Sequence, residues 1–127
     1  MKFDSVNKRS LGSVGEEMAV KYILNLGYDV LDRNYRFKRL GEIDIVAKEG
    51  DFICFVEVKL RTSFCFGTPS EAINKKKRLN ILKVAYIYLN EKKISKPNIR
   101  FDVVEIYIDK ITKRSSINLI KNAFTNF

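Results

Sequence analysis

Histidine is absent from the 127 residues of this chain. Without an imidazole, the chain can build no Ser-His or Cys-His nucleophile pair, no histidine general base and no zinc site that contains histidine. Cysteine is also scarce, and two residues are too few for a four-ligand structural zinc site. The chemistry that remains is that of carboxylates, lysines and bound metal ions.

Long apolar runs are missing as well. The longest run is far too short to span a bilayer, and the N-terminus does not resemble a signal peptide. We therefore expect a cytoplasmic protein that does not enter a membrane.

Acidic residues are outnumbered by basic ones, with 15 Asp and Glu against 24 Lys and Arg, which gives a net charge of +9. A surplus of this size on a small chain favours a polyanionic partner, and nucleic acid is the first candidate. Lysines that only keep the protein soluble would produce the same surplus. Charge alone therefore leaves both interpretations open.

The length and the 46% hydrophobic content predict a single domain over residues 1–127, with flexible ends at 1–10 and 122–127. Hydrophobic periodicity and turn residues predict a helix over 11–26 ended by Gly27, a strand over 28–37, a hairpin over 41–59, a helix over 70–89 capped by Ser70, a strand over 100–108, and a weaker strand or helix near 117–120. This order implies an α/β fold with a mixed central sheet flanked by helices.

The hairpin carries the most informative pattern in the chain. Its two strands are joined at Gly50 and Asp51, and a two-residue loop sets a register in which Asp44 faces Glu57. A loop longer or shorter by one residue would flip the strands relative to each other. Because side chains alternate across a strand, one face carries Glu42, Asp44, Phe55, Glu57 and Lys59, and the other carries Ile43, Ile45, Ala47, Cys54, Val56 and Val58. We expect the second face to be the core and the first to gather charge.

Two explanations fit charges placed inside such an apolar strand, where unpaired ions are costly. The first is a structural ion pair between Lys59 and either Glu57 or Glu42. The second is a site for a divalent cation such as Mg²⁺, with Asp44 and Glu57 as ligands. In the second case the main-chain carbonyl of Val58 adds a third oxygen, a coordinated water becomes the nucleophile, and Lys59 orients that water or stabilises charge on a phosphate.

Basic residues and a second acid flank this pattern. Glu16 lies on the flank of the apolar stripe of the first helix, whereas Glu17 points away from it. The second helix carries a basic run in its first half, formed by Lys75, Lys76, Lys77 and Arg78. The segment 61–69 leaves the charged end of the hairpin, and we expect it to be a loop that contacts substrate.

Several ordered motifs resemble the bacterial YraN family, also called UPF0102, over about Gly12 to Glu105. They are Gly15-Glu16, Gly41-Glu42-Ile43-Asp44, Phe55-Val56-Glu57-Val58-Lys59 and Arg100-Phe101-Asp102-Val103-Val104. This family is similar to the archaeal Holliday-junction resolvases and belongs by its motif to the PD-(D/E)xK, or restriction-endonuclease-like, nucleases. The resemblance implies a restriction-endonuclease-like three-layer core. Ile43 stands where the nominal motif has proline, a position that is commonly degenerate.

The resemblance also assigns roles. Asp44, Glu57 and Lys59 match the motif's acidic and lysine positions, and Glu16 matches a glutamate often found on a helix near the metal. Lys77 matches the basic position in the helix after the motif, and with Arg61 it would contact phosphate, while Gly67 and Pro69 match the family's loop. A homodimer is the state implied for resolvases that cut junctions symmetrically, but the sequence shows no isolated apolar stripe that predicts its interface.

Three hypotheses follow. The first is a Mg²⁺- or Mn²⁺-dependent endonuclease that acts on branched or structured DNA in repair or recombination. The second is a non-catalytic nucleic-acid-binding or scaffold protein that keeps the nuclease-like fold. The third is a purely structural or protein-binding domain, for which neutralising Lys75, Lys76, Lys77 and Arg78 would leave partner affinity intact. Family membership alone does not choose between them, because one fold supports several functions.

Overall fold

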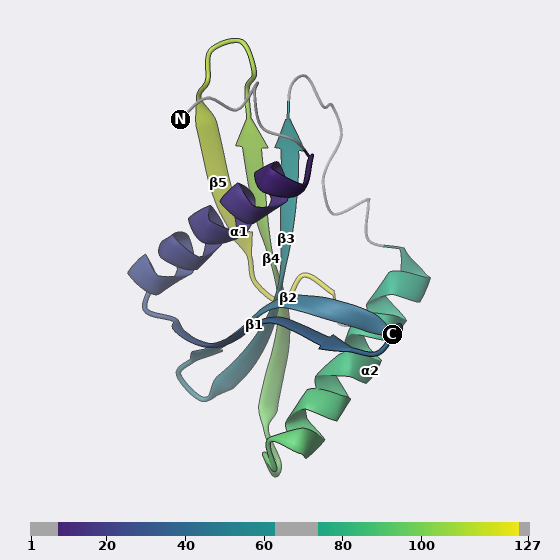
Figure 1. Cartoon of the computed structure of the whole chain (residues 1–127). Helices are drawn as coiled ribbons and strands as arrows, with labels where there is room; N and C mark the ends of the chain where they lie inside the picture. The colour runs from purple at the N-terminus through teal and green to yellow at the C-terminus, as the bar shows by residue number, and fades with distance from the viewer. Residues whose placement is uncertain (1–7, 63–73, 125–127) are drawn as a thin grey trace.

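A five-stranded mixed sheet with one helix on each face forms the protein, whose computed structural model describes residues 8–62 and 74–124, with side chains from Gly12 onward (Figure 1). The elements are α1 (Lys8–Asn25), β1 (Asp29–Phe37), β2 (Gly41–Glu49), β3 (Phe52–Thr62), α2 (Lys75–Glu91), β4 (Asn98–Ile108) and β5 (Ser115–Ile120). The predicted α/β fold and its three-layer core are confirmed. The predicted loop residues 63–69, with Gly67 and Pro69, lie outside the described residues.

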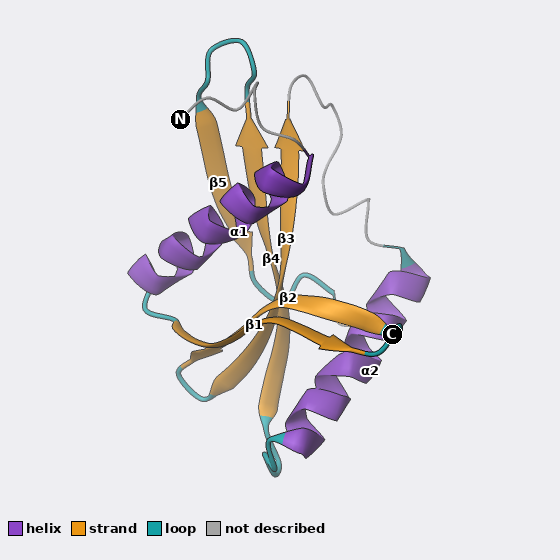
Figure 2. Cartoon of the chain, viewed as in Figure 1, coloured by secondary structure: helices purple, strands orange, loops and turns teal. Residues whose placement is uncertain are grey.

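The strands are arranged in sequence order, β1-β2-β3-β4-β5. Only β3 and β4 run parallel, and α2 lies in the connection between them (Figure 2). The other neighbours are antiparallel. The weak element predicted near residues 117–120 is therefore a strand, which pairs with β4 from Val103 to Ile108.

Local sequence signals set the end of α1. Gly27 has a φ of +95°, a left-handed conformation that glycine adopts without a Cβ clash. The Gly27 N–H donates to the Leu24 carbonyl oxygen at 3.1 Å, and the Tyr28 N–H donates to the Ile23 carbonyl oxygen at 3.0 Å. These two hydrogen bonds form a Schellman motif. The predicted role of Gly27 is confirmed.

The start of α2 differs from the prediction. Asn74, not Ser70, is the N-cap, and its side-chain oxygen accepts a hydrogen bond from the Lys77 N–H at 2.8 Å. Both residue types cap helices well, so propensity did not distinguish them. Ser70 itself lies outside the described residues.

Apolar residues fill both faces of the sheet, which corrects the prediction of one apolar face and one charged face. Ile45, Ala47, Cys54 and Val56 pack beneath α1, as expected. However, Val46 and Phe55 are fully buried in a second cluster beneath α2, so charge occupies only the end of that face. Ile43 also joins the α2 cluster, because the start of β2 turns toward α2, where Gly41 approaches Val84 and Asn80.

A buried ionic network fastens the C-terminal segment to β4. Asp102 is fully buried and accepts hydrogen bonds from Arg100 Nε at 2.9 Å, from the Tyr28 hydroxyl at 3.0 Å and from the Asn122 N–H at 2.9 Å. Phe124 stacks on Phe101 with ring centroids 5.2 Å apart. Residues 122–124, predicted as part of a flexible end, therefore have a defined place, as do residues 8–10 in α1. Residues 1–7 and 125–127 lie outside the described residues.

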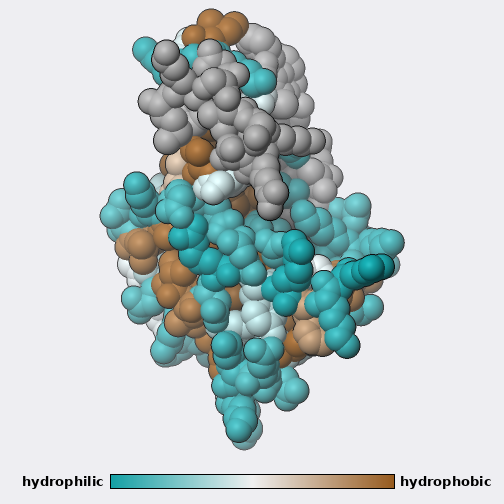
Figure 3. All heavy atoms as spheres, in the orientation of Figure 1, coloured by the Kyte–Doolittle hydropathy of each residue, from teal (hydrophilic) through white to brown (hydrophobic). Residues whose placement is uncertain are grey.

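Among the described residues, no helix is both long and apolar enough to cross a membrane. The described surface visible in Figure 3 is mostly hydrophilic, with smaller apolar patches between the polar regions.

Candidate functional site

The paired carboxylates lie where β2 and β3 separate. The two strands pair from Glu49↔Phe52 to Ile45↔Val56, which confirms the register predicted from the two-residue loop. One step further in the same register come Asp44 and Glu57, beyond the last recorded pair. The backbone pairing ends at this point, and the Asp44 carboxylate raises the pKa of Glu57, so the two acids are neighbours.

A main-chain hydrogen bond fixes the position of Asp44. The Val58 N–H donates to Asp44 Oδ2 at 2.8 Å. In an extended strand the N–H and C=O of one residue point to the same edge, so the Val58 carbonyl also points toward the β2 side. The pKa of Asp44 is raised to about 6, mainly by burial and also by nearby Glu42 and Glu16, while the Val58 N–H and Lys77 act in the opposite direction.

Glu57 is the most deeply buried acid of the site, with 3% of its surface exposed. Its Oε1 atom is buried and has no hydrogen-bond partner within the described parts of the chain. Lys77 Nζ lies 3.9 Å from its other oxygen, Oε2. Burial raises the pKa of Glu57 well above its usual value, and the Asp44 carboxylate raises it further. Such an arrangement is costly unless a cation compensates the two charges.

Lys59 shares the strand face of Glu57 but does not form the predicted structural ion pair. Within residues 8–62 and 74–124, the recorded ion pair of Glu57 is with Lys77, and that of Glu42 is with Arg36 at 2.7 Å. Burial lowers the pKa of Lys59, and Lys77 and Arg61 lower it further, while Glu57 and Asp44 oppose this shift. Lys59 is therefore a half-buried amine whose pKa is lowered mainly by burial and by the neighbouring cations.

Close packing of α1 on β3 places Glu16 beside the site. A Cβ on Gly15 would lie 3.3 Å from Leu60 Cδ2, so any larger residue here would require the Leu60 side chain to shift by a few tenths of an ångström. Glu16 is 15% exposed and lies 3.2 Å from Arg33 Nε, while Asn34 Nδ2 donates to the same Glu16 oxygen at 2.9 Å. Neighbouring Glu17 is 53% exposed, as its position on the helix predicted.

Sequence reasoning missed the residues that hold these acids. Arg33 and Asn34 on β1 bind Glu16, and Arg36 binds Glu42. In the register of β1 and β2, Asn34 falls opposite Asp44, between the recorded pairs Arg33↔Ile45 and Tyr35↔Ile43. Asn34 has a φ of +53°, a left-handed conformation that asparagine adopts more readily than most residues. The sequence pattern of β1 does not indicate these contacts, because the acids that Arg33, Asn34 and Arg36 bind lie on α1 and β2.

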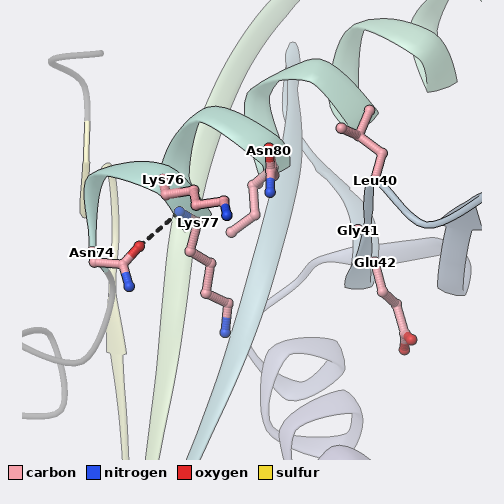
Figure 4. A pocket seen from close by; sticks show the side chains of 8 residues that line it. Leu40, Gly41, Glu42, Asn74, Lys76, Lys77 and Asn80 are labelled. Carbon is pink, nitrogen blue, oxygen red and sulfur yellow. Dashed lines mark hydrogen bonds between the residues drawn. The ribbon is translucent and has the colours of Figure 1, made fainter.

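The predicted basic residues divide into two groups. Lys75, Lys76 and Lys77 are exposed on the first turn of α2, whereas Arg78 turns partly inward and its Nε atom is buried without a partner in the described residues. A pocket of about 270 Å³ opens between this turn and the start of β2, lined in part by Glu42, Asn74, Lys76 and Lys77. Figure 4 shows Lys77 extending from the first turn of α2, and its Nζ atom approaches Glu57 on β3. Arg61, near the end of β3, is half-buried.

The residues present fit a small, hard cation. In the described part of the chain, no three His, Cys, Asp or Glu side chains gather to hold a metal by themselves. Mg²⁺, however, is usually bound by only one or two carboxylates and keeps several water molecules. Asp44, Glu57 and the Val58 carbonyl would supply such a set, and a cation there would satisfy the unpartnered Oε1 of Glu57.

Comparisons with known proteins agree on one family. The model of "Uncharacterised protein family UPF0102" matches residues 15–106, a segment that contains Glu16, Asp44, Glu57 and Lys59. A UPF0102 protein of Clostridium kluyveri is 51% identical over 120 residues, covering 94% of this chain and 97% of its own. One of Acetivibrio thermocellus is 49% identical over 121 residues, covering 93% of each chain. This chain therefore belongs to the UPF0102 family.

Proposed function

We propose that this protein is a Mg²⁺- or Mn²⁺-dependent endonuclease that hydrolyses phosphodiester bonds of branched or structured DNA in repair or recombination. The observation that carries the proposal is the buried, unpartnered oxygen of Glu57, held next to Asp44. Two neighbouring buried acids destabilise a fold at neutral pH, and such groups concentrate at functional sites. The resemblance to junction resolvases supports the substrate class.

Each side chain has a separate task. Asp44 and Glu57, with the Val58 carbonyl, bind the cation, and the Val58 N–H holds Asp44 in place. When bound, the cation supplies positive charge that lowers the pKa of water and neutralises phosphate oxygens. Lys59 orients the attacking water or stabilises charge on the phosphate. Its lowered pKa brings this amine closer to the range in which a lysine can exchange protons.

Basic residues around the acids make the approach of a phosphate favourable. Lys76 and Lys77, exposed on the first turn of α2, line the pocket beside Glu42, and Arg61 near the end of β3 is close enough to Lys59 to lower its pKa. When no metal ion is bound, the negative charges of Asp44 and Glu57 repel a phosphodiester, and these basic side chains offset that repulsion. The protein's net charge of +9 acts in the same direction over a longer range.

The decisive experiment compares the parent with Asp44→Asn and Glu57→Gln. Cleavage of four-way junctions, flaps, duplexes and single strands is measured with Mg²⁺, with Mn²⁺ and with EDTA. We expect both variants to lose about 100-fold or more of the metal-dependent rate, because each loses part of the charge that binds the cation. Asp51→Asn, an exposed change at the hairpin turn, is the matched control and should keep the parental rate. Equal cleavage by all four proteins would refute the proposal.

A non-catalytic nucleic-acid-binding protein is the second candidate. The contact between Lys77 and Glu57 favours it, since a protein cation already approaches the carboxylate that a metal would use. Titration calorimetry with Mn²⁺ separates the two candidates. No Mn²⁺ binding, together with salt-sensitive DNA binding that survives Asp44→Asn, would support the binding protein over the enzyme.

A further inference from the structure

The turn between β1 and β2 lies on the opposite side of Glu42 from the lysines of α2. A hollow of about 310 Å³ is lined by Arg36, Lys38, Arg39, Gly41 and Glu42. Gly41 and Glu42 also line the pocket in front of α2. The two hollows therefore share these residues, and we call the surface from the β1–β2 turn through Gly41 and Glu42 to the start of α2 the path.

Blocks of basic and acidic residues alternate along this path. Within residues 36–41 there are three cations and no acid. Next comes Glu42, followed on β2 by Asp44, and beyond them lie the lysines of α2. Glu42 pairs with Arg36, but Lys38 and Arg39 are exposed, and neither has an ion-pair partner among the described residues. The acids are thus flanked by accessible cations on both sides.

This distribution suits a polyanion better than a single small anion. Cations that bind one phosphate converge on a point, whereas these are spread over two elements with an acid between them. A DNA strand carries phosphates at regular intervals, so it can contact both cationic blocks while one phosphodiester lies between them. Neither block alone would bring that phosphodiester over the carboxylates.

We propose that Arg36, Lys38 and Arg39 of the β1–β2 turn form a second phosphate-binding site for a DNA strand, opposite the site on α2. The inference rests on the proposed function for its choice of DNA as the ligand. The strand crosses the Asp44–Glu57 pair with backbone held on both sides. An internal phosphodiester is thereby presented to the acids, so cutting within a strand is favoured over removal of terminal nucleotides.

The test is a binding measurement that needs no catalysis. The parent, Lys38→Glu/Arg39→Glu and the control Lys93→Glu/Lys96→Glu are titrated in EDTA with a labelled 20-nucleotide single strand and with a four-way junction. The control changes the net charge equally at exposed positions, and both Lys38 and Lys93 have a positive φ. Its residues follow the far end of α2, and a helix of 17 residues is about 25 Å long.

We expect the turn variant to bind the strand at least tenfold more weakly and to reduce the slope of log affinity against log salt by about one to two. The control should stay within about threefold of the parent. Lys38→Gln/Arg39→Gln removes the same two positive charges without adding the two glutamates of the turn variant. An intermediate loss of DNA affinity in this variant would exclude an effect that comes only from the new glutamates acting on Asp44. Thermal melting checks that all the variants are folded.

The outcomes also distinguish this site from the nuclease proposal. If the turn variant and the control bind alike, the second phosphate site is refuted, whether or not the parent cleaves DNA. If the turn variant alone loses binding but no metal-dependent cleavage is found, the phosphate site stands and the nuclease proposal fails. If the parent binds neither probe, the second phosphate site is refuted, while cleavage by the parent with Mg²⁺ or Mn²⁺ still decides the nuclease proposal.

Discussion

Lys77 Nζ on α2 lies 3.9 Å from Glu57 Oε2 on β3. The buried carboxylate at the centre of the site is thus approached by a cation from a different layer of the fold. In the proposed enzyme this lysine has two competing effects, since it offsets the charge of Glu57 and repels an incoming metal ion.

Replacing Lys77 by methionine should separate these effects. Methionine keeps the apolar stem but removes the charge, so we expect Mn²⁺ affinity to rise by about threefold to tenfold. DNA binding in EDTA should weaken, because one phosphate contact is lost. Lys83→Met, an exposed change further along α2, is the control. Weaker Mn²⁺ binding by the Lys77 variant would mean that this lysine helps to build the metal site rather than competing for it.

The raised pKa of Asp44 predicts how stability depends on pH. Since its pKa rises from 3.8 to about 6 on folding, the folded protein holds this proton more tightly than the unfolded chain does. The resulting stabilisation is fully present below pH 3.8 and is lost as the pH rises through about 6. Its size is on the order of 3 kcal/mol.

Asp44→Asn should therefore be more stable than the parent at pH 8 in EDTA, and the difference should vanish near pH 4. Asparagine carries no charge and can still accept the hydrogen bond from the Val58 N–H. Urea unfolding of both proteins from pH 4 to pH 8 measures the difference, with Asp51→Asn as the control. Parallel curves for parent and variant would show that Asp44 is not destabilised by its surroundings.

Divalent cations should offset most of this difference in stability. A ligand that binds only the folded state stabilises it, by about 2.7 kcal/mol at 100 times its dissociation constant. We expect Mn²⁺ to raise the melting temperature of the parent at pH 8 and to leave that of Asp44→Asn and Glu57→Gln unchanged. An equal rise in all three proteins would place the bound Mn²⁺ elsewhere.

Two adjacent acids on α1, Glu16 and Glu17, allow a direct comparison of their variants. Glu16 and Glu17 both contact Arg33, yet only Glu16 adds to the raised pKa of Asp44. If Glu16 assists the metal site, Glu16→Gln should lower metal-dependent cleavage about tenfold, while Glu17→Gln should change it less than twofold. Both variants lose one charged contact with Arg33, but Glu16 also accepts a hydrogen bond from Asn34, so the melting temperatures of both variants are needed to separate a structural effect from an effect on cleavage. Initial rates at saturating DNA and varied Mn²⁺ provide the measurement.

Removing the negative charge of Asp102 should destabilise the protein, whereas removing that of Asp44 should stabilise it at pH 8, although both are acids in the sheet. Arg100 and Tyr28 already bind it, so its charge is compensated within the fold. Asp102→Leu leaves Arg100 paired with Glu49 alone and removes the acceptor of the Tyr28 hydroxyl, so it should destabilise the protein by about 3–5 kcal/mol. Denaturant unfolding measures this loss. Mn²⁺ affinity per folded molecule should not change, and a selective loss of metal binding would instead connect Asp102 to the site.

Short-range sequence signals determined much of this protein. The two-residue turn at Gly50 and Asp51 set the register that brings Asp44 opposite Glu57, because a hairpin turn and alternating side chains leave one pairing. Gly27 ended α1, because only a left-handed residue completes that cap cheaply. The order of elements was enough to predict an α/β fold with a mixed sheet.

Tertiary structure decided which partners surround those acids. The contact of Lys77 with Glu57, the capture of Glu16 by Arg33 and Asn34, and the packing of Phe124 on Phe101 join elements that are remote in sequence. No local periodicity encodes such contacts, since they depend on how the helices lie across the twisted sheet. The sequence placed two acids face to face, and the packing of α1 and α2 buried them among cations and raised their pKa values.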